Sequence, residues 1–179
     1  MTGPVITGQQ IGLLGGPLYT TYKVLGAIHY AHTIQTTPVY WLETNDADFN
    51  EINHIHFLDK DNTLQTLTWD IDSRGYSCGF IEVDDKLINL LDTFFSSIKQ
   101  TQHTDSLRTI VAESYQKGTP LGTASRTLAR GLYGWSPVTL FNPSTEDFLA
   151  TVRHILEKEA ESTEPGNRCH FFCIENKKR

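Results

Sequence analysis

Cysteine is scarce in this 179-residue chain, and the three present, Cys78, Cys169 and Cys173, are too few for a disulfide framework. We therefore expect reduced thiols and a cytoplasmic location. Long apolar runs are also missing, because no segment approaches the length that spans a bilayer, and the N-terminus lacks the features of a signal peptide. An excess of positive charge is missing too, since the net charge is −6 at pH 7. This balance argues against a nucleic-acid or membrane-binding surface.

What the chain does contain is the composition of an ordinary globular domain, with 39% hydrophobic and 20% charged residues. Its length suits one domain with a real core and is too short for two. We place that domain at residues 1–161. The remainder, 162–179, is polar, contains Pro165-Gly166 and ends in three basic residues. It has no periodicity, and we predict a disordered tail there.

The most informative segment is Val5–Lys23, VITGQQIGLLGGPLYTTYK. Its β-branched start, Val5–Thr7, predicts a short strand, and Pro17 stands where a first helical residue is favoured. Between them lie four glycines within nine residues: Gly8, Gly12, Gly15 and Gly16. Such a bare turn lets an anion lie on backbone N–H groups at the positive end of a helix, which is where open α/β sheets bind nucleotides. A glycine-rich connection that serves only packing is the alternative.

This turn differs from two familiar phosphate-binding patterns. It has no Gly-Lys-Ser/Thr triplet, and Lys23 lies a full turn inside the predicted helix, so it is not a P-loop. Gly8 and Gly12 are four residues apart, so the Rossmann glycine spacing fails as well. We expect the amides of residues 15–18 to bind a phosphate or a carboxylate at the helix N-terminus.

The turn opens a predicted β-α-β unit. Apolar residues recur at helical spacing up to about Gln35, and Pro38–Leu42 is a nearly continuous apolar run, typical of a strand buried on both faces. Two parallel strands joined by one helix should form a right-handed unit. A third core strand is expected at Val138–Phe141, followed by a helix from the cap signature at Ser144 to about Glu161.

The intervening residues predict an insertion. The two arms of a hairpin are expected at Ile52–Leu58 and Leu64–Ile71, followed by an extended piece at Arg74–Val83. Three helices are then expected at Asp84–Lys99, Thr104–Lys117 and Pro120–Tyr133. The fold class is therefore α/β, a partial Rossmann-like parallel sheet flanked by helices, with an inserted β-hairpin and helical segment. Because so small a sheet leaves its edges open, we expect it to be the first part of a larger α/β domain.

An acidic turn follows the second predicted strand. Asp46, Asp48 and Glu51 would lie at the carboxyl edge of the sheet, where they could orient an ammonium or a hydroxyl group. In the alternative, Asp46 and Asp48 cap the next element and lie in water. His54 and His56 would share one strand face, as a metal pair requires, but no third ligand is evident, so we predict no metal. The pair Cys169 and Cys173 gives only a weak zinc signal.

With these segments in view, the chain resembles the bacillithiol biosynthesis cysteine-adding enzymes, also called cysteine ligases. The resemblance rests on the motif TGQQxGLxxGPLY within Val5–Lys23, which is far more specific than a lone glycine motif. It also rests on Pro38–Leu42, on the pattern DxDFxEINH over residues 46–54, and more loosely on Tyr115–Phe141. It covers most of the chain.

The resemblance implies a cytoplasmic enzyme that joins cysteine to glucosaminyl-malate by forming a carbon–nitrogen bond. It also implies a Rossmann-like core similar to class I aminoacyl-tRNA synthetases, a coiled coil that supports dimerisation, and an adenine nucleotide, ATP or ADP, at the glycine turn. Partners would be the small-molecule substrates, with a homo-oligomer or a complementing C-terminal fragment. The candidate nucleotide-binding residues are Gly8, Gln9, Gln10, Gly12, Gly15, Gly16, Pro17, Tyr19 and Lys23, and the candidate catalytic residues are Asp46, Asp48, Asn53 and His54.

The chain departs from the family pattern in two respects. Family members are much longer, and their acidic turn usually has the pattern Glu-Asp-His-Asp where this chain has Asn45-Asp46-Ala47-Asp48. A carboxylate and an imidazole are thus replaced by groups that cannot transfer protons. We expect a truncated member that forms no product on its own. Two alternatives stay open: a non-catalytic nucleotide- or anion-binding module, and a nonfunctional gene remnant.

Overall fold

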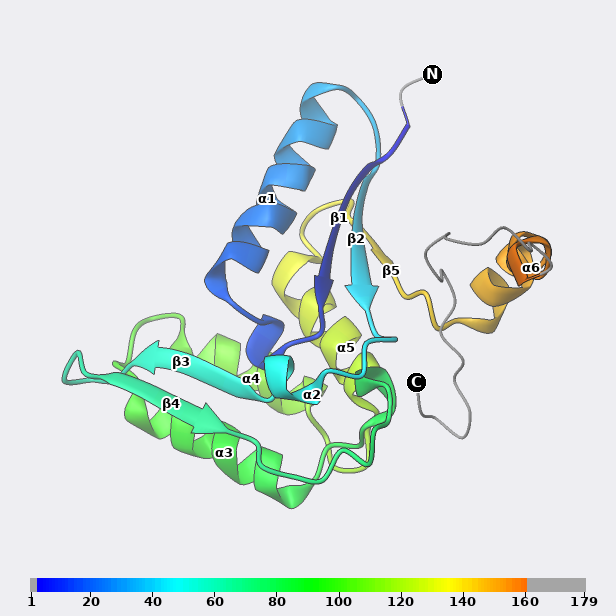
Figure 1. Cartoon of the computed structure of the whole chain (residues 1–179). Coiled ribbons are helices and arrows are strands. Elements are labelled where there is room, and N and C mark those ends of the chain that lie inside the picture. Colours follow the sequence, from blue (N-terminus) through cyan, green and yellow to red (C-terminus); the bar gives the residue numbers. More distant parts are fainter. Residues whose placement is uncertain (1–2, 161–179) are drawn as a thin grey trace.

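The computed structural model describes residues 3–160. Its centre is a parallel three-stranded sheet in the order β1-β2-β5, formed by β1 (Val5–Gln10), β2 (Pro38–Glu43) and β5 (Thr139–Phe141) (Figure 1). Helix α1 (Leu18–Thr33) leads from β1 to β2, and these two strands pair in register along their whole length. The predicted α/β class and the parallel β-α-β unit are confirmed.

Strand β2 lies in the middle of the sheet, and its residues alternate in burial. Pro38, Tyr40 and Leu42 are buried, whereas Val39 and Trp41 on the other face are only half-buried. The expectation of a strand buried on both faces is therefore wrong for the second face. Helix α5 (Leu121–Tyr133) packs near the buried side, where the rings of Tyr40 and Tyr133 meet edge to face.

Strand β5 is an edge strand rather than a core strand. Thr139 is exposed and Leu140 and Phe141 are half-buried, because β5 pairs with β2 on one side only. Helix α6 (Glu146–Ala160) follows it, starting within the predicted cap signature. Phe148 of α6 packs against the rings of Trp41 and Phe141, which partly covers the second face of the sheet.

The predicted insertion is present, with shifted bounds. After the short helix α2 (Phe49–Ile52) come the antiparallel strands β3 (His54–Leu58) and β4 (Leu64–Thr68), so Ile52 and Ile71 lie outside the hairpin. The extended piece expected over 74–83 instead contains the 3₁₀ helix η2 (Cys78–Phe80), which is held because Gly79 donates its amide to the Thr44 carbonyl. Helices α3 (Asp85–Ser97) and α4 (Thr104–Ser114) complete the insertion.

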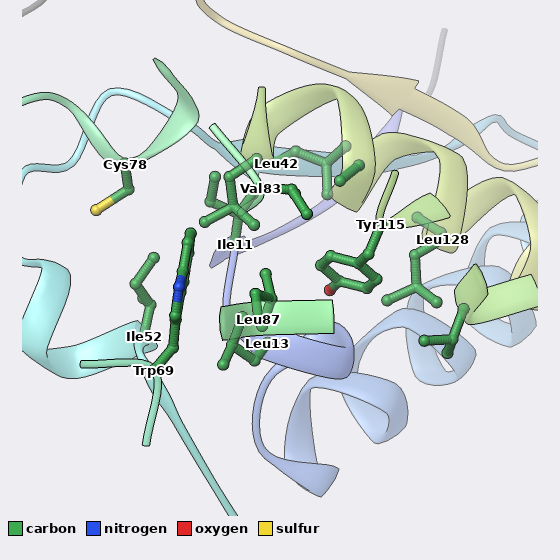
Figure 2. Packing of buried hydrophobic residues seen from close by; sticks show 14 of the residues in the cluster. Ile11, Leu13, Leu42, Ile52, Trp69, Cys78, Val83, Leu87, Tyr115 and Leu128 are labelled. Carbon is green, nitrogen blue, oxygen red and sulfur yellow. The ribbon is translucent and has the colours of Figure 1, made fainter. Parts of the chain in front are cut away.

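One hydrophobic core joins the sheet to the insertion. Figure 2 shows Trp69 and Ile52 from the hairpin region packed near Ile11 and Leu13, which follow β1. Leu13 and Leu87 are fully buried in this cluster. The hairpin is therefore packed against the segment that leads into the glycine turn, and this packing fixes the position of the site.

None of the helices within residues 3–160 combines the length and the apolarity needed to cross a membrane. The predicted tail, 162–179, and the cysteines at 169 and 173 lie outside the described residues.

Candidate functional site

The glycine turn is a tight double bend between β1 and α1. It contains the 3₁₀ turn η1 (Leu13–Gly15), in which Leu14 has a φ of 54°. Gly15 and Gly16 follow with φ of 91° and 78°, in the region that favours glycine. A Cβ at Gly12 would lie 2.8 Å from the Gly16 Cα, so the two ends of the bend come together as only glycine allows.

The amides of this bend are used inside the fold. Gly15 donates to the Gly12 carbonyl at 3.1 Å, and Gly16 donates to the Leu13 carbonyl at 3.0 Å. Pro17 has no N–H. The prediction that residues 15–18 form a cradle of unused amides is therefore wrong for Gly15, Gly16 and Pro17. What remains are the amides of Leu18 and Tyr19 in the first turn of α1, since the Thr20 amide donates to the Pro17 carbonyl at 2.8 Å.

Lys23 is tied to the end of β1. Its Nζ donates to the Gly8 carbonyl at 2.7 Å and to Gln9 Oε1 at 3.1 Å, and it lies 5.6 Å from the centre of the Tyr19 ring. Lys23 thus links helix α1 to the end of strand β1.

A cavity of about 320 Å³ opens beside the turn. Three segments form its wall: the end of β1, the start of α1, and the chain from α2 into β3. Its lining residues are Gln9, Gln10, Gly12, Gly16, Pro17, Leu18, Glu51, Ile52, His54, Ile55 and His56. The two segments that the sequence singled out, the glycine turn and the acidic turn with its histidines, therefore meet at one cavity near the carboxyl end of β1.

Gln10 joins these two segments directly. Its Nε2 donates to Asp46 Oδ2 at 2.5 Å and to Glu51 Oε2 at 2.6 Å. One amide group thus bridges two carboxylates from the acidic turn and holds that turn against the last residue of β1. The lining is acidic on balance, because Glu51 belongs to it and it contains neither lysine nor arginine.

Asp46 and Asp48 lie beside the cavity rather than in its wall. The Asp48 amide donates to Asp46 Oδ1 at 3.1 Å, which is a local turn contact. Asp48 precedes α2 and is exposed, but its side chain makes no capping bond. The capping alternative is therefore wrong for Asp48, while Asp46 shapes the turn and binds Gln10.

Asn53 and His54 form a connected pair at the start of β3. Asn53 is 9% exposed, and its Nδ2 donates to the Trp69 carbonyl at 3.4 Å. Its Oδ1 lies 3.1 Å from His54 Nδ1. His56, two residues on, has its Nδ1 2.8 Å from Thr66 Oγ1, and the two imidazole centres are 4.9 Å apart.

Some of the predicted site residues line the cavity and others do not. Of the candidate set, Gln9, Gln10, Gly12, Gly16, Pro17 and His54 line it, whereas Gly8, Gly15, Tyr19, Lys23, Asp46, Asp48 and Asn53 do not. Leu18, Glu51, Ile52, Ile55 and His56 also line it. Of these, Glu51 was expected at the carboxyl edge of the sheet as a group that could orient an ammonium, whereas Ile52 and Ile55 were not singled out as site residues. The period-two spacing of His54 and His56 was the signal for the second histidine. Within residues 3–160 no cluster of three or more His, Cys, Asp or Glu side chains is arranged to hold a metal ion.

With this geometry established, comparison with known proteins identifies the family. A family model described as "Bacillithiol biosynthesis BshC, N-terminal Rossmann-like domain" matches residues 1–175. The chain belongs to this family. The resemblance given by the glycine and acidic turns is thereby confirmed.

Curated relatives agree. The "Putative cysteine ligase BshC" of Chloroherpeton thalassium is 29% identical over 169 residues, which cover 88% of this chain and 30% of that protein. The protein of the same name in Flavobacterium psychrophilum is 30% identical over 140 residues, which cover 74% of this chain and 25% of that protein. The protein of Heliobacterium modesticaldum is 36% identical over 106 residues, which cover 55% of this chain and 19% of that protein. The chain spans less than a third of the length of these relatives.

Proposed function

We propose that this chain supplies the substrate-binding N-terminal part of an enzyme that joins cysteine to glucosaminyl-malate in bacillithiol biosynthesis. The observation that carries the proposal is the single cavity at which the glycine turn meets the segment from Glu51 to His56. Its volume of about 320 Å³ lies within the range of small-molecule sites. The family relationship supports the reaction class, since the relatives carry the name of a cysteine ligase.

The lining suits a substrate that carries an amine. Forming a carbon–nitrogen bond requires an amine that has lost its proton, so the site needs a group that attracts an ammonium and a group that accepts a proton. Glu51 offers a carboxylate for the first task, and His54 and His56 offer imidazoles for the second. Glucosaminyl-malate has such an amine on its sugar.

A polyphosphate fits this lining less well. The cavity wall holds no lysine or arginine, Lys23 is engaged at Gly8, and the amides of Gly15 and Gly16 donate within the turn. ATP or ADP therefore stays a prediction restricted to the first turn of α1, at Leu18 and Tyr19, and we assign the cavity itself to the amine substrate.

Isothermal titration calorimetry of the purified chain tests the proposal with three probes: glucosaminyl-malate, malate and ADP. We expect glucosaminyl-malate to bind more tightly than malate, because only the former presents an ammonium to Glu51. Glu51→Gln should weaken that binding at least tenfold, whereas Glu113→Gln, the same change at an exposed residue of α4, should leave it unaltered. Equal binding of glucosaminyl-malate and malate, or none of either, would contradict the assignment.

Turnover requires a separate measurement. We expect the chain alone, given cysteine, glucosaminyl-malate and ATP, to form no cysteinyl-glucosaminyl-malate above background by mass spectrometry. The reason is that Asn45 and Ala47 replace the titratable groups of the family pattern, and Asn45 is engaged elsewhere, since its Oδ1 accepts from Ser144 Oγ at 2.5 Å. Robust product would overturn that expectation.

A non-catalytic anion-binding module is the second candidate, favoured by the structural use of Asn45 in place of a proton-transferring group. It predicts binding that follows negative charge alone. Malate, ADP and glucosaminyl-malate would then compete for one site in the order of their negative charge, and Glu51→Gln would strengthen all three by removing a repelling carboxylate.

A further inference from the structure

We infer that His54 is the proton acceptor of the cavity and that Asn53 is its positioning residue, which holds the imidazole with its hydrogen on Nδ1 and its lone pair on Nε2. The inference rests on the proposed function for the identity of the proton donor, an amine-bearing small molecule. The tautomer itself does not depend on that function.

The orientation of the Asn53 amide is decided by Trp69. A backbone carbonyl can only accept, so the Asn53 group that lies 3.4 Å from the Trp69 oxygen must be its NH₂. The backbone amide of Trp69 in turn donates to the backbone carbonyl of Asn53 at 2.7 Å, so two hydrogen bonds join these residues. Trp69 is 1% exposed, and its Nε1 donates to Asp84 Oδ1 at 2.9 Å. Asn53 is thus held in place by Trp69, which is itself buried and hydrogen-bonded to Asp84.

With its NH₂ turned to Trp69, Asn53 presents its oxygen to His54. An amide oxygen cannot donate, so the His54 Nδ1 that lies 3.1 Å away must carry the hydrogen. A neutral imidazole with a hydrogen on Nδ1 has its lone pair on Nε2. Because His54 lines the cavity and its Nδ1 is engaged with Asn53, the lone pair is the group left to meet a ligand.

His56 is not set in the same way. Its Nδ1 lies 2.8 Å from the hydroxyl of Thr66, which can donate or accept, so this contact permits either tautomer. The two neighbouring histidines therefore differ in how their contacts constrain the tautomer, although they are the same residue type. Of these two imidazoles, His54 is the one whose partner dictates where its hydrogen lies.

The proton balance is simple. The ammonium of the bound amine gives a proton to His54 Nε2, so one substrate N–H bond breaks and one imidazole N–H bond forms. The amine keeps the electron pair and becomes a nucleophile, and the positive charge moves to the imidazolium. The Glu51 carboxylate, in the same wall, is the anionic group that would hold the ammonium before the transfer.

Nitrogen-15 NMR of the histidine rings tests the inference on the whole chain, in buffer alkaline enough that imidazoles are neutral. We expect His54 to show a protonated Nδ1 and an unprotonated Nε2. Asn53→Leu should abolish this preference, whereas Asn53→Asp, which keeps an acceptor, should retain it. Thr66→Val should change the ring signals of His56 and leave those of His54 unaltered. Because the decisive measurement uses the unmodified chain, a variant that fails to fold does not prevent the test.

Titration with glucosaminyl-malate, with malate as control, supplies the second readout. A shift of His54 Nε2 with the amine and not with malate supports the inference. A hydrogen on Nε2 in the ligand-free chain would overturn it, whatever binds. Amide shifts at Gly12 and Gly16 without any change at His54 would overturn it too, while leaving the proposed function intact. The expected tautomer, with no cavity residue responding to the amine, would overturn both the proton-acceptor role and the proposed function.

Discussion

The phenolic oxygen of Tyr115 accepts a hydrogen bond of 3.0 Å from the backbone amide of Leu14, 101 positions earlier in the chain. Tyr115 follows α4 and is 3% exposed, and burial raises its pKa above the ordinary value. Leu14 has a φ of 54°, a left-handed conformation that is unusual for leucine. The inserted helices thus hold the glycine turn in a conformation that its own sequence does not favour.

Removing the Tyr115 hydroxyl should therefore loosen the turn. Tyr115→Phe leaves the Leu14 amide without its acceptor, and we expect a loss of about 1–3 kcal/mol in the free energy of unfolding. Chemical denaturation measures the loss, and hydrogen exchange at the Leu14 amide should become faster. Tyr133→Phe is the matched control, because that hydroxyl donates to a side chain, Thr21 Oγ1 at 3.3 Å, and not to the glycine turn. Equal effects of the two changes would contradict the special role of Tyr115.

Alkaline pH should destabilise the fold through the same residue and its neighbour Tyr40. Burial raises the pKa of both phenols above 10.0, and for Tyr40 the nearby Tyr133 and Tyr115 raise it further. In the unfolded chain these phenols ionise near the ordinary value, while in the folded chain they stay neutral. Their contribution to stability is thus fully present below pH 10.0 and is lost as the pH rises above it.

The thermal unfolding midpoint, followed from neutral pH to well above pH 10.0, measures this dependence. Tyr40→Phe should reduce the fall above pH 10.0, whereas Tyr30→Phe, at a side chain that is 57% exposed, should not. An identical fall in both variants would mean that other groups cause it.

Gly12 in the turn and Gly26 in helix α1 should respond in opposite directions to alanine. Gly12→Ala places a Cβ 2.8 Å from the Gly16 backbone, and we expect a loss of about 1–3 kcal/mol from the forced shift. Gly26 lies inside α1 with no neighbouring atom within 4 Å of an added Cβ. Gly26→Ala should therefore stabilise by about 0.5–1 kcal/mol. Denaturant midpoints of the two variants measure these changes in stability. An unchanged midpoint for Gly12→Ala would contradict the close approach of Gly12 to Gly16.

Neighbouring glutamines offer a second matched pair. Gln10→Glu would place a third carboxylate against Asp46 and Glu51 and remove their shared donor, with an expected cost of about 1–3 kcal/mol. Gln9→Glu would face Lys23 instead, and it should change stability by about 0–1 kcal/mol in the favourable direction. The cost of Gln10→Glu should shrink in high salt, which screens like charges. Unfolding at low and high salt measures both, and a harmless Gln10→Glu would contradict the bridging role of Gln10.

The parts of the fold set by local pattern could be predicted from the sequence. Helix α1, strand β2 and the helical insertion follow periodicity and caps, such as Asp84, whose Oδ1 accepts from the Leu87 amide. Strand β1 was predicted too short, because Gly8-Gln9-Gln10 has the composition of a turn. Pairing with β2 makes it a strand, since Gln10 lies opposite Glu43.

The candidate site depended on distant contacts that periodicity does not record. The sequence indicated that the glycine and acidic turns both mattered, and they do line or flank one cavity. It did not reveal that Gly15 and Gly16 use their amides within the bend. Nor could it reveal that the Asn53 side chain donates to the Trp69 carbonyl across the hairpin, the contact from which we infer a positioning role for Asn53.

The most direct measurement of the central claim is a backbone amide NMR titration of the chain with glucosaminyl-malate. If the cavity between the glycine turn and the Glu51–His56 segment is the binding site, Gly12, Gly16, Ile52 and His54 will shift together and saturate with one affinity. If those amides stay unmoved while the groove between α3 and α4, around Phe95 and Arg108, responds instead, the site has been assigned to the wrong face of the molecule.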